Sequence, residues 1–178
     1  GYNLPQIDTD CLNSIITNTK YKPYVLTYFD NYNSGFTLTA IWNRFIKRSD
    51  CDYICLLNND TKVSPGWLEK MVDTLERSPS IGFVGPSTNQ CHSPQKSIGT
   101  IEQALTHENE FEIMTEPISG FCLLFRRCTW RKLNGFDERF KTYGQESDFI
   151  DRAKALGLKC AWRKDAFVFH HGEMSVKA

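Results

Sequence analysis

The sequence lacks a surplus of charge of either sign. Its 178 residues include 21 Lys and Arg against 21 Asp and Glu, and neither half of the chain is polarised. Domains that bind the phosphate backbone of DNA or RNA usually carry a basic surplus or a basic stripe. The charge balance therefore argues against a nucleic-acid partner.

Long hydrophobic runs are absent as well. No apolar stretch approaches the roughly 18 residues that a transmembrane helix requires. No signal peptide is visible near the first residue. We therefore expect no membrane span and a cytoplasmic location.

The seven cysteines include no CxxC pair. Cys51 and Cys55 are separated by three residues, and no second half completes a zinc site. Cys55 and Cys122 lie inside apolar runs, where a reduced cysteine behaves as a small core residue. This usage indicates a reducing, intracellular compartment.

Apolar residues are present in the amount that a folded core needs. They make up 40% of the chain, and aromatic residues make up 13%. A chain of this length suits one domain that buries roughly 70% of its unfolded surface. Disorder is therefore excluded as the main state.

The apolar pattern predicts strands that alternate with helices. Helical spacing of apolar residues predicts helices around 11–16, over 36–48, from Ser64 to Leu75 and over 145–156. Ser64 is the expected cap of the third helix, and Gly157 is expected to end the fourth. Short apolar runs predict strands at 24–29, 53–57, 81–84, 121–125, 158–162 and 166–169. This alternation predicts an α/β fold, with a mostly parallel central sheet flanked by helices, in a single domain.

Oxygen-bearing side chains follow two of the predicted strands. Asp30 follows the strand at 24–29, and Asn58–Thr61 follow the strand at 53–57. Ligands of open parallel sheets bind beyond the carboxyl ends of the strands, and divalent cations that carry phosphates take oxygen ligands. Asp30 alone could equally be a turn residue. The four consecutive side chains at Asn58–Thr61 predict a cation site.

Two histidines, His170 and His171, end the last predicted strand. Successive side chains of an extended segment point to opposite faces. We therefore expect at most one of the two to bind a metal.

Two carboxylates, Glu146 and Asp148, lie in the first turn of the helix predicted at 145–156. The helix dipole favours acids there by about 0.3–1 kcal/mol each, and Asp148 can pair with Arg152 four residues later. Either carboxylate could instead be a general base. The residues alone leave both interpretations open.

Together these motifs resemble glycosyltransferase family 2, a family of nucleotide-sugar-dependent enzymes of the GT-A fold. The most similar stretch runs from Asp52 to Leu68 (DYICLLNNDTKVSPGWL) and resembles the rhamnosyltransferase-like branch. The other matching motifs follow in the family's order: Tyr2-Asn3, Cys11–Ile15, Asp30-Asn31, Gly35-Phe36, Asn43-Arg44, Ile81–Pro86, Ser119–Phe121, Leu133–Phe140, Tyr143–Phe149, and His170 with Ser175.

The resemblance implies transfer of a sugar from a nucleotide-diphosphate sugar to an acceptor hydroxyl of a glycan or another compound, with inversion at the anomeric carbon. It assigns a divalent cation, Mn²⁺ or Mg²⁺, to Asp60 and His170, because a Lewis acid neutralises the charge of the diphosphate leaving group. The donor, a UDP- or dTDP-sugar, would bind through Asn58, Asn59 and Asp60.

The resemblance also implies that Tyr2 stacks on the nucleobase and that Asp30 accepts a base N–H. Glu146 would be the general base. We expect it to rely on its placement rather than on a raised pKa, because a helix N-terminus lowers the basicity of a carboxylate. Acceptor choice is expected to lie in the mostly polar residues 85–117.

The sequence departs from the family pattern at several places. No apolar strand precedes Tyr2, and the loop after Asp30 is shorter than in relatives. Asn58 stands where many relatives carry the first acid of a DxD motif, and Gln145 precedes Glu146 where Glu-Asp is common. We expect residues 1–178 to form one GT-A domain, either an N-terminally trimmed piece or one domain of a longer chain.

Two other functions fit fewer of these features. One is a non-catalytic nucleotide-sugar-binding domain of a larger transferase, which would bind the donor without turning it over. The other is a metal-dependent phosphoesterase built on Asp60 and the histidine pair, although that chemistry usually needs a denser set of ligands.

Overall fold

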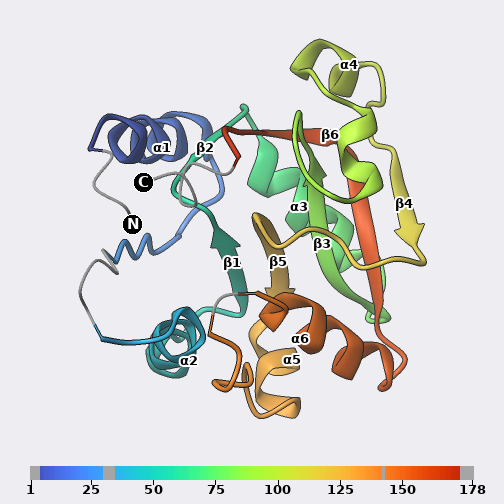
Figure 1. Cartoon of the computed structure of the whole chain (residues 1–178). Coiled ribbons are helices and arrows are strands. Elements are labelled where there is room, and N and C mark those ends of the chain that lie inside the picture. Colours follow the sequence, from blue (N-terminus) through green and yellow to red (C-terminus); the bar gives the residue numbers. More distant parts are fainter. Residues whose placement is uncertain (1–4, 30–34, 142, 173–178) are drawn as a thin grey trace.

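The computed structural model describes residues 5–29, 35–141 and 143–172 (Figure 1). Its helices are α1 (Pro5–Asn18), α2 (Leu38–Arg48), α3 (Trp67–Glu76), α4 (Ile101–Leu105), α5 (Arg127–Lys132) and α6 (Gln145–Lys154), with the 3-10 helix η1 (Pro94–Ser97). Its strands are β1 (Tyr53–Leu57), β2 (Thr61–Val63), β3 (Ile81–Ser87), β4 (Phe111–Met114), β5 (Cys122–Arg126) and β6 (Lys159–His170). The four predicted helices are thereby confirmed as α1, α2, α3 and α6.

The strands form one sheet in the order β1-β5-β3-β6-β2, with β4 also paired to β6. The α/β class, with a central sheet flanked by helices in a single domain, is confirmed. The expectation of a mostly parallel sheet is wrong, because among the described pairs only β3 and β6 run parallel. β1 and β3 do run in the same direction. However, β5 comes later in the chain, inserts between them and pairs antiparallel with both.

The strand predicted at 24–29 is not a strand. These residues belong to no helix or strand, and Val25 is 75% exposed. An apolar run becomes a strand only when a neighbouring strand covers it and takes its hydrogen bonds. β1 pairs with β5, and the described residues place no strand on the opposite edge of β1.

Three details of the helix and strand ends also differ from the sequence prediction. Ser64 does not cap α3, because Gly66 is the residue before the helix and adopts a left-handed conformation (φ 73°). The strands predicted at 158–162 and 166–169 are one strand, β6, whose register with β3 shifts between the pairs Pro86–Arg163 and Ser87–Phe167. α6 ends at Lys154 with Ala155 as its cap, two residues earlier than predicted, and Gly157 lies in the turn that follows, with φ 81° and its N–H donated to the Lys154 carbonyl.

Alternating side chains along the strands divide the core into two layers. Val84 and Leu124 pack on one face of the sheet with apolar residues of α1 and α3. Phe83, Leu123 and Phe125 pack on the other face with apolar residues of α2 and α6. Figure 1 shows α3 behind the sheet and α6 in front of its lower part. The two faces of the sheet are therefore covered by different helices.

The polar residues 85–117 are folded onto the sheet through Gln95. This side chain is fully buried, donates to the Pro86 carbonyl (2.6 Å) and accepts the Ser119 N–H (2.8 Å). The segment also contains η1, α4 and β4, which the sequence did not predict. It is an ordered connection rather than a single loop.

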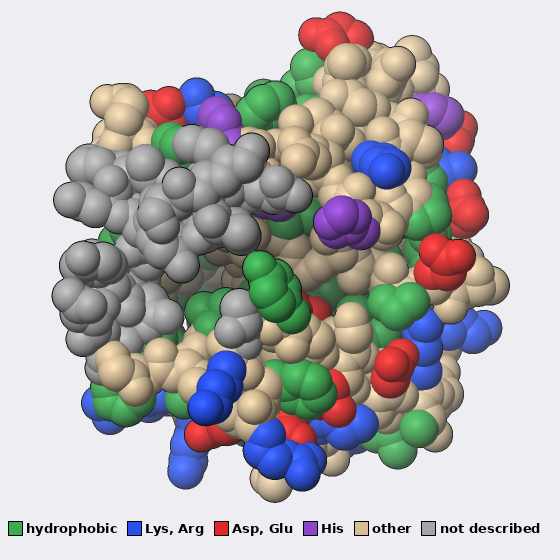
Figure 2. All heavy atoms as spheres, in the orientation of Figure 1, with side chains coloured by type: hydrophobic (Ala, Val, Ile, Leu, Met, Phe, Trp, Pro, Cys, Tyr) green, Lys and Arg blue, Asp and Glu red, His purple; other side chains and the backbone are tan. Residues whose placement is uncertain are grey.

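Basic side chains gather along the lower edge of the face drawn in Figure 2, over α2, α5 and α6, with acids beside them. The last turns of these helices contain basic residues, which the helix dipole favours at that end: Lys47, Arg48, Arg131, Lys132, Arg152 and Lys154. Within the described ranges, every helix falls short of the length and apolarity that a membrane crossing requires.

Candidate active site

The pairing of β2 with β6 brings Asp60 and His170 together. Thr61 lies opposite His170 in this antiparallel pair, so Asp60, which precedes β2, reaches the end of β6. Asp60 is 6% exposed, and its Oδ1 lies 3.3 Å from His170 Nε2. The two residues assigned to the metal by the family resemblance are therefore neighbours, although 109 positions of sequence separate them.

The His170 side chain is held by groups from two other segments. Its Nδ1 lies 3.0 Å from the Gln90 carbonyl, and its ring stacks on Phe121 with centroids 4.9 Å apart. Its backbone is also fixed, because Asn89 Oδ1 accepts the His170 N–H (2.7 Å) and Asn89 Nδ2 donates to the His170 carbonyl (3.0 Å). The imidazole is thus fixed before any ligand binds.

These contacts decide which ring nitrogen of His170 carries a proton. A carbonyl oxygen can only accept, so Nδ1 must donate to Gln90. In the neutral ring the lone pair of Nε2 then faces the Asp60 carboxylate, which is also an acceptor. Burial lowers the pKa of His170, but the hydrogen bonds with Asp60 and with the Gln90 carbonyl outweigh it, and the pKa lies above its ordinary value. The pair therefore attracts a cation, either a proton or a metal ion.

His171 lies apart from the Asp60 carboxylate. Its backbone N–H donates to the Asp60 carbonyl (2.9 Å), while its ring packs edge-on against Phe169 at 5.0 Å between centroids. The alternation expected of an extended segment is therefore observed. It directs His170, rather than His171, at Asp60.

The Asn58–Thr61 turn is fixed through its backbone. Asn58 donates its N–H to the Phe121 carbonyl (2.8 Å), and its own carbonyl accepts the Thr61 hydroxyl (2.7 Å). Asn58 is exposed, so its amide faces solvent next to the buried Asp60. This arrangement leaves Asn58 open to a ligand that approaches Asp60.

Asn59 is turned toward α1 and not toward solvent. Its Nδ2 donates to Asp8 Oδ1 (2.6 Å), and the other oxygen of Asp8 accepts the Tyr28 hydroxyl (2.9 Å). Asp8 therefore connects α1, the segment 24–29 and the turn that carries Asp60. No pattern in the sequence predicts this link.

Glu146 lies in the first turn of α6, beside Gly120. Gly120 precedes Phe121, whose ring stacks on His170. An atom added at the Cβ position of Gly120 would lie 2.5 Å from Glu146 Oε1. Burial raises the pKa of Glu146, and the hydrogen bond from its own backbone N–H offsets this only in part. The expectation that the pKa would not be raised is therefore wrong, because loss of hydration outweighs the helix N-terminus.

Asp148 pairs with Arg152 along α6, as the spacing of four residues allows. Its Oδ2 accepts hydrogen bonds from Arg152 Nε (2.9 Å) and forms an ion pair with Nη2 (2.7 Å). Arg152 also donates to the carbonyls of Leu133 and Gly135. Arg152 therefore fastens α6 to the segment before it, and Asp148 holds Arg152 in place.

Two predicted donor-binding residues, Tyr2 and Asp30, lie outside the described residues. Among those described, the structure brings together Asn58, Asp60 and His170, and connects them through Phe121 and its neighbour Gly120 to Glu146. Sequence reasoning missed three residues that hold His170 or its turn: Asn89, Gln90 and Phe121. The signals were that Asn89 and Gln90 follow an apolar strand, as Asn58 and Asn59 do, and that Phe121 ends the Ser119–Phe121 motif. Figure 2 shows histidine side chains beside a hollow near the centre of this face.

The donor set at this site fits a divalent cation in part. A buried carboxylate and an imidazole nitrogen that face each other are common metal ligands, and the Gln90 contact orients the ring as outer hydrogen bonds do in metal sites. In the described part of the chain, no cluster of three or more His, Cys, Asp or Glu side chains could hold a metal. Asp60 and His170 would therefore need further oxygen ligands from a bound molecule.

Comparison with known proteins identifies the family. The model of glycosyl transferase family 2 matches residues 31–156. The chain is 27% identical over 167 residues to the O-antigen biosynthesis protein RfbC of Myxococcus xanthus, an alignment that covers 83% of this chain and 13% of the relative. It is 24% identical over 144 residues to the N-acetylglucosaminyl-diphospho-decaprenol L-rhamnosyltransferase of Mycobacterium tuberculosis, covering 67% of this chain and 47% of the relative.

The chain therefore spans less than half the length of each of these relatives. The match to the family model nevertheless extends over most of the chain, from just before α2 to the end of α6. It includes the Asn58–Thr61 turn and Glu146. This chain belongs to glycosyl transferase family 2.

Proposed function

We propose that this domain transfers a sugar from a nucleotide-diphosphate sugar to an acceptor hydroxyl, with a divalent cation, Mn²⁺ or Mg²⁺, held by Asp60 and His170. The observation that carries the proposal is the 3.3 Å approach of His170 Nε2 to the buried Asp60 carboxylate, with the imidazole fixed by the Gln90 carbonyl. When bound, the cation would neutralise the diphosphate as it leaves. The oxygens of the diphosphate would complete its coordination.

The remaining donor contacts are proposed for residues around this pair. The exposed amide of Asn58 would bind a diphosphate oxygen, and the Asn58–Asp60 backbone would line the same site. Tyr2 would stack on the base and Asp30 would accept its N–H. The relatives named for O-antigen biosynthesis and for L-rhamnosyl transfer favour L-rhamnose or a related sugar carried on dTDP or UDP, and a glycan as the acceptor.

Glu146 is the proposed base. Its carboxylate would take the proton of the acceptor hydroxyl as that oxygen attacks the anomeric carbon. The bond from the anomeric carbon to the diphosphate oxygen breaks on the opposite side, so the configuration inverts. A raised pKa makes the carboxylate a stronger proton acceptor once it is ionised. Asp148 is a poorer candidate, since Arg152 engages its oxygen twice.

A donor screen tests this proposal. The full chain would be incubated with a panel of nucleotide sugars, with Mn²⁺ or with a chelator, and the release of free nucleoside diphosphate would be measured. We expect release from UDP- or dTDP-sugars only with the metal, and faster release with a glycan acceptor. Tight donor binding without turnover would instead indicate a non-catalytic binding domain. Hydrolysis of simple phosphoesters would indicate a phosphoesterase.

A further inference from the structure

The backbone conformation at position 120 does not require a glycine. It is absent from the glycines with positive φ, a group that includes Gly66, Gly144 and Gly157. Its backbone is therefore open to any L-residue. The explanation for a glycine at this position must lie in the space around it.

That space is occupied by Glu146. A Cβ atom at Gly120 would lie 2.5 Å from Glu146 Cγ, 2.5 Å from Oε1 and 2.6 Å from Cδ, and these are its three nearest neighbours. Carbon atoms in van der Waals contact are about 3.5–4.0 Å apart, so a methyl group and the carboxylate cannot both be accommodated. The atoms in the way belong to the end of a flexible side chain, so the carboxylate would move and the backbone would not need to.

The residue after Gly120 contacts the other half of the site. The Phe121 ring stacks on His170, and the Phe121 carbonyl accepts the N–H of Asn58. One two-residue segment therefore touches the proposed base on one side, and the proposed metal ligand and donor turn on the other. A shift of this segment or of Glu146 would change the distance between base and donor.

We propose that Gly120 is a positioning residue for the transfer reaction, in that its missing side chain leaves the volume in which the Glu146 carboxylate sits while Phe121 fixes that volume relative to His170. This inference rests on the proposed function, because it takes Glu146 as the base. It predicts that any side chain at position 120 displaces the carboxylate without affecting the metal or the donor. Burial of Glu146 is consistent with this close packing.

The test is Gly120→Ala in the full chain. We expect the rate of sugar transfer at saturating donor to fall by about 10²-fold, as a displacement of about 1 Å does for other reacting groups. The Mn²⁺-dependent affinity for the nucleoside diphosphate and the melting temperature should stay close to those of the wild type. The control is Cys128→Ala, because Cys128 is exposed in α5 at the opposite end of β5 from Phe121, and this variant should transfer at the wild-type rate.

A second background makes the result independent of general damage to the fold. In Glu146→Gln, the base is already lost, so Gly120→Ala should reduce the residual transfer rate little further. An equal loss in both backgrounds would show that Gly120 acts through another contact and would overturn the inference. So would wild-type transfer by Gly120→Ala, or loss of nucleotide binding together with transfer.

The same variants separate this inference from the proposed function. If Glu146→Gln keeps the wild-type transfer rate, the base assignment fails, and the role of Gly120 fails with it. If Glu146→Gln loses transfer while Gly120→Ala keeps it, the base assignment stands and only the role of Gly120 is wrong.

Discussion

The carboxylates of Glu146 and Asp148 lie two residues apart on α6 but in different surroundings. Asp148 is neutralised by Arg152. Glu146 is half-buried, its carboxylate accepts a hydrogen bond from its own backbone N–H, and burial raises its pKa. Carboxylates with different surroundings in one site usually have different tasks. This difference supports the proposal that Glu146 is the base, while Asp148 holds Arg152 against the segment before α6.

Glu146→Gln should slow transfer by about 10²-fold or more, the low end expected for loss of a general base. The same variant should melt at or above the wild-type temperature at neutral pH. The reason is that a group whose folded pKa is raised loses stability as pH rises through that pKa, so the ionised Glu146 destabilises the fold. Asp148→Asn is the control and should melt lower while it keeps most of its transfer rate. Loss of transfer in Asp148→Asn with unchanged melting, beside an active Glu146→Gln, would identify Asp148 as the base.

The pH dependence of transfer should also report Glu146. The carboxylate must be ionised to accept a proton, and its pKa lies above the ordinary value of 4.5. The transfer rate at saturating donor should therefore fall on acidification at a pH above this ordinary value. The residual rate of Glu146→Gln, measured over the same range, should lack that acid limb. An identical limb in both proteins would assign the titration to another group.

Asp8 joins α1 to the Asn58–Thr61 turn, which is proposed to bind the donor, so Asp8 should influence donor affinity from outside the reacting groups. Asp8→Ala removes the acceptor of both Asn59 and the Tyr28 hydroxyl. We expect weaker binding of the nucleoside diphosphate with little change in the transfer rate at saturating donor. A lower saturated rate with unchanged affinity would contradict this role. Gln6→Ala is the matched control, because Gln6 also lies on α1 but its amide, within the described part of the chain, donates to Asp10 on the same helix.

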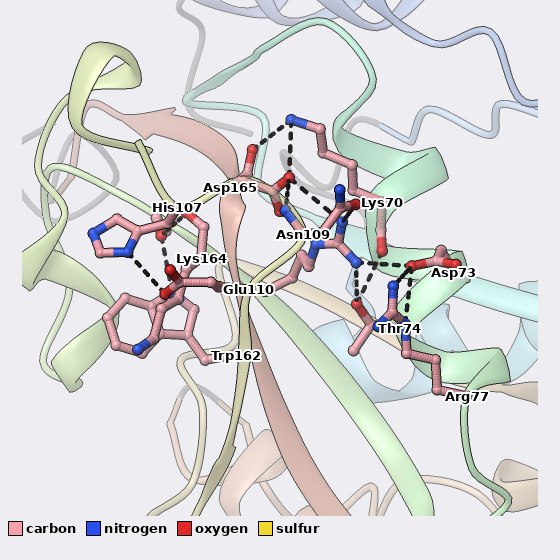
Figure 3. A network of polar contacts seen from close by, with 12 residues as sticks. Lys70, Asp73, Thr74, Arg77, His107, Asn109, Glu110, Trp162, Lys164 and Asp165 are labelled. Atoms are coloured by element: carbon pink, nitrogen blue, oxygen red, sulfur yellow. Dashed lines mark hydrogen bonds and ion pairs between the residues drawn. The ribbon is translucent and has the colours of Figure 1, made fainter. Parts of the chain in front are cut away.

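At the scale of the elements, β6 is the strand that carries His170, and a buried ion network fixes its irregular middle part. The Arg163 side chain is 1% exposed and donates to Asp165, to Asp73 Oδ2 (2.8 Å) and to Asn109 Oδ1 (3.1 Å). Figure 3 shows this network joining α3, β6 and the turn before β4, with Asp73, Asn109 and Asp165 around a common centre. Lys70 also lies 3.5 Å from Asp165. The network spans the part of β6 where its register with β3 shifts.

Asp165→Asn should therefore cost stability. Burial raises the pKa of Asp165, but the hydrogen bonds from Arg163 and from the Asn109 backbone outweigh it, and the pKa lies below 3.8. Removing one partner of a buried ion pair costs about 3–5 kcal/mol in the free energy of unfolding. Asp73→Asn is the control, because this partner of Arg163 is 52% exposed and should cost only about 0–1 kcal/mol.

The pH dependence of this loss follows from the lowered pKa of Asp165. Its contribution is complete above the unfolded pKa of about 4 and disappears as pH falls through the folded pKa. Denaturant unfolding at about pH 7 and about pH 3 should show the difference between wild type and Asp165→Asn shrinking at the lower pH. A constant difference would mean that Asp165 contributes through packing rather than charge.

Most helices and strands could be predicted from the sequence because each has a local signal. The apolar face of α2 and the apolar runs of β1 and β3 can be recognised from residues that are close together in the sequence. The place of β5 between β1 and β3 could not be predicted, because β5 lies 35 or more residues after both and strand order is set by packing. The strand prediction at 24–29 was wrong for a related reason, since an apolar run forms a strand only where a second strand pairs with it.

At the scale of the whole molecule, the candidate site lies where distant segments converge. Asp60 precedes β2, His170 ends β6, Phe121 precedes β5 and Glu146 begins α6. The sequence could suggest Asp60, His170 and Glu146 by residue type and motif, since each follows a strand or opens a helix. It could not indicate the roles of Gln90 and Gly120, because these depend on contacts across the fold, although Gly120 lies in the Ser119–Phe121 motif. Residue type alone carries no signal for such contacts.

The most direct test of the account is the metal-dependent affinity of the chain for UDP or dTDP. Titration calorimetry would compare the wild type with Asp60→Asn, His170→Ala and His171→Ala, each with Mn²⁺ and with a chelator. We predict that wild-type binding requires Mn²⁺, that Asp60→Asn abolishes this requirement together with tight binding, and that His170→Ala weakens binding more than His171→Ala. Unchanged Mn²⁺-dependent affinity in Asp60→Asn, or a greater loss in His171→Ala than in His170→Ala, would contradict the account.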